Sequence, residues 1–88
     1  MSHRQGSVLV AKLLTLLTCA EVWLRIRSYD DLGLAYADMR EFMNFCPDMV
    51  PNFLDLLKQA EIWRQKANHE EIARCHREML KLLEGVEA

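Results

Sequence analysis

The segment Ala20-Glu21-Val22-Trp23 recurs forty residues later as Ala60-Glu61-Ile62-Trp63, and these two segments contain both tryptophans of the chain. The same offset relates Ser28-Tyr29-Asp30-Asp31-Leu32 to Asn68-His69-Glu70-Glu71-Ile72. Self-similarity at a fixed period of about 20 to 50 residues is typical of helical units that stack on one another. The sequence is therefore predicted to contain two copies of one structural unit.

Length and composition favour one folded domain. The 88 residues are 51% hydrophobic and 27% charged, with a net charge of −2. This balance is typical of a folded chain and not of a nucleic-acid-binding one, which concentrates positive charge on one face. The apolar stretch from Val8 to Ala20 contains Lys12 and is too short to cross a bilayer, so neither a secretory signal nor a membrane partner is expected.

The cysteine content indicates a cellular compartment. Cys19, Cys46 and Cys75 are odd in number and irregularly spaced. Such a set predicts reduced, buried thiols and not a disulfide framework. The expected location is therefore the cytoplasm.

Apolar residues at spacings of three and four predict an all-α chain of four helices, with no strands. The expected organisation is a flexible N-terminus (residues 1–6), a first helical hairpin (7–46), a second helical hairpin (48–84) and a C-terminal tail (85–88). Within the hairpins, the breaks between helices fall near Arg27 and Lys66. Short connections of this kind join antiparallel neighbours.

Capping residues place the helix ends. Ser28 with Asp31, and Asn68 with Glu71, each form a capping box that predicts a helix start. The same preferences make Asp48 a candidate N-cap, place Pro51 in a first helical turn, and make Gly85 a helix stop. A continuous helix through Asn68 is the alternative.

Two antiparallel helix pairs with small and aromatic residues at fixed offsets resemble the tetratricopeptide repeat. Ala20 and Ala60 stand at the small position of its first helix, and Trp23 and Trp63 stand at the aromatic position. The post-turn and second-helix positions are occupied by Tyr29, Leu32, Tyr36 and Met39 in the first copy, and by His69, Ile72, His76, Met79 and Leu80 in the second. The resemblance implies that both tryptophans are buried, each against its own hairpin.

The chain departs from that family in three respects. Arg27 and Ala67 replace the usual turn glycines, Met39 and Met79 are bulkier than the usual alanines, and the period is 40 instead of 34. A four-helix bundle that shares this spacing is therefore the alternative architecture.

His69, Cys75 and His76 are the residues that could carry chemistry. Structural zinc requires four ligands at characteristic spacings, which these residues lack, so packing roles are expected and no metal or cofactor is predicted. Cys75 lies mid-helix on the apolar stripe, where a thiol is inert. With no recognisable catalytic motif, the chain is not expected to be an enzyme.

The resemblance implies a binding face formed by the first helix of each unit. Its expected members, taken as partner-binding residues, are Leu14, Leu17, Glu21 and Leu24 from the first unit, and Leu54, Leu57, Lys58, Glu61 and Arg64 from the second. This mostly aliphatic set suits an amphipathic helix or an apolar peptide. The best-known peptide-binding members clamp a C-terminal carboxylate with Lys, Arg and Asn on this face, and Leu17, Glu21 and Glu61 do not match that pattern.

The predicted function is a non-catalytic protein–protein interaction module, acting as an adaptor or a small dedicated chaperone. Two repeats fall short of the three or more that such arrays need, so the chain is expected to be completed by a partner or by a second copy. The alternative function is a self-associating structural bundle, a homodimer without a peptide groove. In that case the predicted leucines are covered within the fold or by the second copy.

Overall fold

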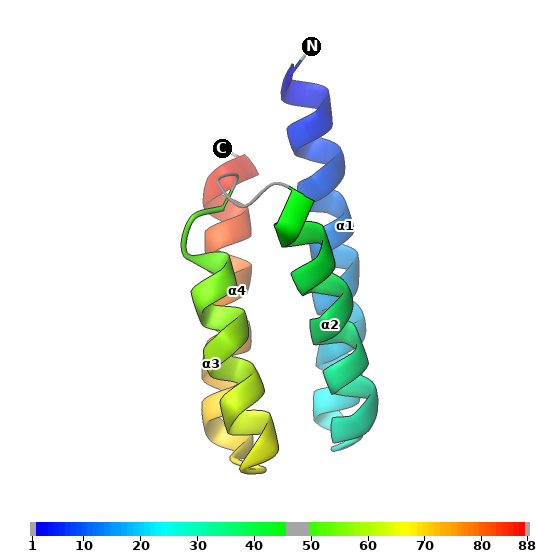
Figure 1. Ribbon diagram of the computed structural model, residues 1–88, viewed down its shortest axis with the longest axis vertical. Coiled ribbons are helices and arrows are strands. Elements are labelled where there is room, and N and C mark those ends of the chain that lie inside the picture. The colour runs from blue at the N-terminus through cyan, green and yellow to red at the C-terminus, as the bar shows by residue number, and fades with distance from the viewer. Residues whose placement is uncertain (1, 46–49, 88) are drawn as a thin grey trace.

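A computed structural model describes residues 2–45 and 50–87, which form four α-helices (Figure 1). The helices are α1 (Ser2–Arg25), α2 (Tyr29–Phe45), α3 (Phe53–Gln65) and α4 (His69–Glu87). No strand occurs within the described ranges, which confirms the all-α prediction. None of these helices is long and apolar enough to cross a membrane.

The helices form two antiparallel hairpins, hairpin 1 (α1 and α2) and hairpin 2 (α3 and α4), which pack side by side in an elongated body of 41 × 21 × 20 Å (Figure 1). Between the hairpins, α1 contacts α4 and α2 contacts α3. Among the described residues, the diagonal pairs α1–α3 and α2–α4 have no Cα atoms within 8 Å of each other. The hairpins therefore close into a four-helix bundle, the alternative architecture of the sequence analysis.

Both hairpin turns are built in the same way. The amide N–H of Ser28 donates to the carbonyl of Trp23 (2.8 Å), and that of Asn68 donates to the carbonyl of Trp63 (3.0 Å). The residues before them, Arg27 and Ala67, have φ angles of 59° and 55°. These are Schellman ends, in which a left-handed residue normally supplied by glycine satisfies the last carbonyls of a helix. The break predicted at Asn68 is thus confirmed.

Helix starts follow the predicted caps in part. The side chain of Asn68 accepts a hydrogen bond from the amide of Glu71 at 3.3 Å, as a capping residue should. Ser28 instead donates its hydroxyl to the carboxylate of Asp31 at 2.6 Å. α3 begins at Phe53, so Pro51 lies in the turn before the helix and not in its first turn. The predicted cap Asp48 lies outside the described residues.

The two chain ends differ from expectation. α1 begins at Ser2, earlier than the helix start expected after residue 6. α4 continues through Gly85 to Glu87, so this glycine does not stop the helix. Gly85 has open space around it, and nothing in its surroundings forces the backbone to turn.

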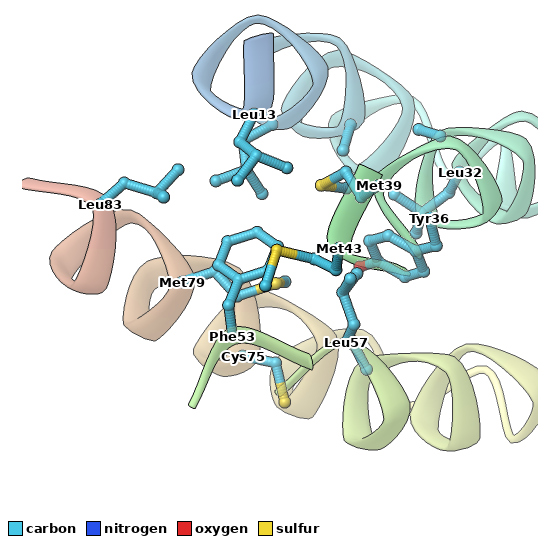
Figure 2. Packing of buried hydrophobic residues seen from close by; sticks show 14 of the residues in the cluster. Leu13, Leu32, Tyr36, Met39, Met43, Phe53, Leu57, Cys75, Met79 and Leu83 are labelled. Atoms are coloured by element: carbon cyan, nitrogen blue, oxygen red, sulfur yellow. The ribbon is translucent and has the colours of Figure 1, made fainter. Parts of the chain in front are cut away.

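Buried residues recur at the same offset of forty as the sequence repeat. Leu17 and Leu57, Ala20 and Ala60, and Met39 and Met79 are all buried, and each pair is separated by forty residues. The same holds for Val10 and Val50, Leu13 and Phe53, Leu32 and Ile72, Ala35 and Cys75, Tyr36 and His76, and Met43 and Leu83. Figure 2 shows side chains from all four helices converging on this shared core. Equivalent residues thus have equivalent environments.

One contact identifies the symmetry. The hydroxyl of Tyr29 lies 3.1 Å from Nδ1 of His69, and their ring centroids are 6.3 Å apart. These two residues are repeat equivalents, and their contact together with the reciprocal pairings α1–α4 and α2–α3 is what a two-fold axis between the hairpins produces. The hairpins are therefore related by an approximate two-fold axis that runs along the bundle.

The tryptophans are not core residues. Trp23 and Trp63 occupy equivalent positions, as predicted, but both are only partly buried and pack against the edge of the core. Nζ of Lys66 lies 5.4 Å from the ring centroid of Trp63 on its outer side. Their positions in the last turn before a hairpin loop leave one side of each ring open to solvent.

Candidate functional site

The predicted binding face on α1 and α3 does not exist as a surface. Leu17 and Leu57 are fully buried, and Leu24 is nearly so. The helices that carry them lie diagonally across the bundle, and the described parts of α1 and α3 have no Cα atoms within 8 Å of each other. These leucines therefore belong to the core. The expectation that these three leucines form an exposed binding face is wrong, because each helix has two neighbours and buries a wider arc of its surface.

The other predicted residues are scattered over separate places. Leu14 and Leu54 are partly buried against the core, and Glu21 pairs with the exposed Arg25 at 3.1 Å. Lys58 is exposed and, with Leu54, lines a shallow groove of about 560 Å³ between α2 and α3. The structure brings together only this pair and the pair described next.

Glu61 and Arg64 form an ion pair in the seam between the hairpins. Nε of Arg64 lies 2.5 Å from the Glu61 carboxylate, and both side chains are mostly shielded from solvent. Nη1 of Arg64 donates to the carbonyl of Tyr29 at 3.1 Å, across to α2. A Cβ placed on Gly33 would lie 2.9 Å from Cζ of Arg64, so the glycine leaves room for the guanidinium. The pair binds the hairpins together and is structural.

Of the three candidate chemical residues, Cys75 and His76 are buried and His69 is partly buried. His69 contacts Tyr29, while Cys75 is buried and His76 is only 5% exposed. Within the described ranges, neither ring nitrogen of His76, nor the hydroxyl of Tyr36, has a hydrogen-bond partner. Burial lowers the pKa of His76, opposed by nearby Glu21, and burial raises the pKa of the Cys75 thiol. These directions favour a neutral imidazole at His76 and a protonated thiol at Cys75.

Residues that could hold a metal ion are not grouped. In the described part of the chain, no cluster of three or more histidine, cysteine, aspartate or glutamate side chains is present. Cys19 is exposed, which corrects the expectation of a buried thiol, and Cys46 lies outside the described residues.

Each hairpin carries a groove on its outer face, away from the bundle axis. The groove of hairpin 1 has a volume of about 410 Å³, and Leu16 and Phe42 are its partly buried apolar floor. The groove of hairpin 2 has a volume of about 470 Å³, with Leu56 and Leu82 in the equivalent places. Two-fold symmetry thus gives the molecule two similar grooves.

The surfaces around the two grooves differ sharply. On hairpin 1, Leu34 is 66% exposed and Phe45 is 84% exposed. The equivalent residues on hairpin 2 are Arg74 and Gly85. Further along α1, Ile26 is also exposed and Cys19 lies on the same side, where hairpin 2 has Lys66 and Gln59. Hairpin 1 is therefore apolar at positions where hairpin 2 is polar.

We call this surface the outer face of hairpin 1. Helical periodicity places its members on one side of the hairpin, beside the groove. They are Val8, Lys12, Leu16, Cys19 and Ile26 from α1, and Leu34, Asp38, Glu41, Phe42 and Phe45 from α2. None of them was among the predicted site residues.

A signal for this face was present in the sequence. Where the two copies are aligned at an offset of forty, most core positions stay apolar in both, and Leu24 opposite Arg64 is an exception. Leu34 opposite Arg74, and Phe45 opposite Gly85, are positions where only the first copy is apolar. Such one-sided positions distinguish a surface with a specific role from a residue that the fold requires.

The chain was compared with known proteins. No protein-family model matches it, and no curated protein and no solved structure shows significant similarity. The resemblance to the tetratricopeptide repeat stays a prediction.

Proposed function

We propose that this protein is a non-catalytic protein–protein interaction module, an adaptor or small dedicated chaperone, and that the outer face of hairpin 1 is its contact surface. The observation that carries this proposal is the difference between the two hairpins. Hairpin 2 has the same fold with Arg74 and Gly85 where hairpin 1 exposes Leu34 and Phe45. The fold therefore does not require these exposed apolar residues, and clustered exposed apolar residues mark an interaction site.

The shape of the surface suits a helical partner. Two antiparallel helices leave a groove between them whose floor is Leu16 and Phe42. An amphipathic helix places its apolar side into such a groove and its polar side toward solvent. Lys12, Asp38 and Glu41 line the groove and supply charges that can select the partner.

The state of the buried polar groups supports a non-catalytic role. His76 and Cys75 are closed off from solvent by the core. A nucleophile or general base must reach its substrate, and these groups do not. The free thiols Cys19 and Cys75 support a reducing compartment such as the cytoplasm.

The experiment that tests this proposal is site-specific photo-crosslinking in the cells that naturally express the protein. A photoreactive amino acid replaces Leu34 on hairpin 1 or, as the matched control, Arg74 on hairpin 2. We expect a discrete protein adduct from position 34 and little from position 74, because only the apolar face is covered. Equal labelling at both positions, or no adduct at position 34, would contradict the proposal.

A further inference from the structure

The proposed contact surface carries charges of both signs in a definite arrangement. We propose that its occupant is the same face of a second copy of this chain, so that the working unit is a homodimer with parallel hairpins. This inference rests on the proposed function, because it names the partner of that same surface.

A contact within hairpin 1 shows which residues of α1 and α2 lie at the same height along the hairpin. Nζ of Lys12 lies 5.7 Å from the ring centroid of Phe42, so these two residues stand at the same height on antiparallel helices. Because the two helices are antiparallel, counting back along α1 and forward along α2 from this pair brings Val8 to the height of Phe45. Counting the other way brings Cys19 to the height of Leu34, with an error of one residue in each case. Each exposed apolar residue of α2 thus has an apolar or thiol-bearing neighbour on α1.

A two-fold axis parallel to the helices would place α1 of one copy over α2 of the other at the same height. Lys12 of each copy then meets Asp38 and Glu41 of the other, and Val8 meets Phe45. Both contacts occur twice, as an isologous interface requires. The bundle contains the same arrangement within one chain. There, α2 of hairpin 1 packs against α3 of hairpin 2, and α3 is the repeat equivalent of α1.

The charges at this face are available for such pairing. Among the ion pairs of the described residues, none involves Lys12, Asp38 or Glu41. Opposite charges that meet across an interface fix its register, and like charges that meet oppose association. An antiparallel arrangement would place the acidic α2 of one copy against α2 of the other, so the charge pattern favours the parallel one.

Hairpin 2 does not offer a comparable surface. The exposed apolar residues of hairpin 1 are replaced there by Arg74, Lys66 and Gly85. Arg74 is paired with Glu71 and Glu78 on its own helix, and burying these charges and Lys66 against the apolar face would remove them from water, which is costly. The face of hairpin 1 is therefore expected to pair with itself and not with hairpin 2, which closes the assembly at two copies instead of a filament.

The size of the face suits a weak, reversible dimer, at the small end of the range of specific interfaces. From Val8 to Ile26, α1 extends about 27 Å at a rise of about 1.5 Å per residue. Two adjacent helices are about 18 Å wide, so the face covers on the order of 500 Å² in plan, and its corrugated surface is larger. Specific interfaces bury roughly 800 Å² per partner.

The first test is the mass of the purified full chain by sedimentation over a range of concentrations. We expect a reversible dimer that Leu34→Arg, which introduces the residue of hairpin 2, weakens at least about tenfold, because each dimer would bury two charged side chains in place of two apolar ones. Gln59→Arg places the same side chain on the outer side of hairpin 2 and should leave the dimer unchanged. Circular dichroism establishes that both variants are folded.

The second test exchanges charges and is specific for a second copy. Lys12→Glu in one variant, and Asp38→Lys with Glu41→Lys in another, should each weaken the dimer about tenfold, because like charges then meet twice. Mixing the two variants should restore an affinity close to that of the parent. In the mixed dimer the introduced glutamate meets the introduced lysines, and the remaining Lys12 meets Asp38 and Glu41 of the other copy. A mixture that associates no better than either variant would overturn this arrangement.

The outcomes also separate this inference from the proposed function. A parent chain that stays monomeric up to about 1 mM, where even weak dimers form, would overturn the second copy as occupant. If position 34 then crosslinks to a different protein in cells, the proposed function stands and only the partner is wrong. A monomer with no adduct at that position would contradict both.

Discussion

The two seams that join the hairpins use equivalent positions and different chemistry. In the α2–α3 seam, Arg64 pairs with Glu61, donates to the carbonyl of Tyr29 and lies against Gly33. In the α1–α4 seam the equivalent of Arg64 is Leu24, which is buried. The same backbone therefore accepts a shielded ion pair or an aliphatic side chain at one position. What the seams share is the apolar core behind them, and that core holds the hairpins together.

The outer faces of the two hairpins are alike in exposure and different in residue type. Val22 and Ile62 are equivalents with nearly equal exposure, 51% and 52%, so the two hairpins present this position to solvent in the same way. Leu34 and Arg74 nevertheless differ completely in polarity. At most buried positions the fold imposes the residue type and the copies agree, whereas at an exposed position such as this one the fold leaves the residue type open.

The largest expected effect concerns the equivalence of the core. Leu17→Ala and Leu57→Ala should each lower the free energy of unfolding by about 3 kcal/mol, because each opens a cavity in a closely packed interior. Chemical denaturation followed by circular dichroism measures both. Values that differ by more than about 1 kcal/mol would break the comparison, since equivalent packing should give similar losses.

The next largest effect is the energetic coupling between Gly33 and Arg64, which distinguishes the α2–α3 seam from the α1–α4 seam. Gly33→Ala improves helix propensity by about 1 kcal/mol but pushes the guanidinium of Arg64 from its place. In an Arg64→Leu background, which copies the α1–α4 seam, only the gain remains. A double-mutant cycle should therefore give a coupling energy of about 1–2 kcal/mol between the two positions. Additive effects would show that Gly33 does not accommodate Arg64.

The turns should respond alike and more weakly. Arg27→Gly and Ala67→Gly should each stabilise the protein by about 0.5–1 kcal/mol, because both residues have left-handed backbone angles that glycine adopts without steric cost. Thermal unfolding detects the change. Ala37→Gly in the interior of α2 is the control, and it should destabilise by about 1 kcal/mol. A loss of stability at either turn would contradict the left-handed geometry there.

The smallest expected effect distinguishes His76 from its equivalent Tyr36. Burial lowers the pKa of His76 in the folded state, so the unfolded chain binds more protons once the pH falls below the ordinary histidine pKa of about 6.5. This contribution to stability is complete above that value. It is lost as the pH decreases toward the folded-state pKa.

Replacing His76 with Tyr should remove that part of the pH dependence. Urea unfolding at pH 7.5 and at pH 5.5, values chosen on either side of the unfolded-state pKa of about 6.5, measures it. Glu21 faces His76 from α1 and Arg77 lies beside it on α4, so Glu21→Gln is a useful second variant. It should steepen the loss in acid, because it removes the carboxylate that favours the imidazolium. An identical pH profile for the parent and His76→Tyr would show that the imidazole is hydrated.

Several features of the fold could be predicted from the sequence. The period of forty established two equivalent hairpins, and the preference of Asn68 for capping placed the break before α4. Local steric and hydrogen-bonding preferences decide such features, and they act within a few residues. Where several local outcomes were possible, the sequence was insufficient. Gly85 continued a helix that it could have ended, and α3 began two residues after Pro51.

The tertiary structure alone decided which faces meet. Spacing along a helix identifies an apolar stripe, but it does not give the number of neighbouring helices that cover it. A stacked array would have left Leu17 and Leu57 at its inner surface, whereas the closed bundle buries them. The contact of Tyr29 with its own equivalent His69 likewise depends on a two-fold axis that no local preference encodes. Helix formation is a local property, while closure depends on contacts between residues far apart in the chain.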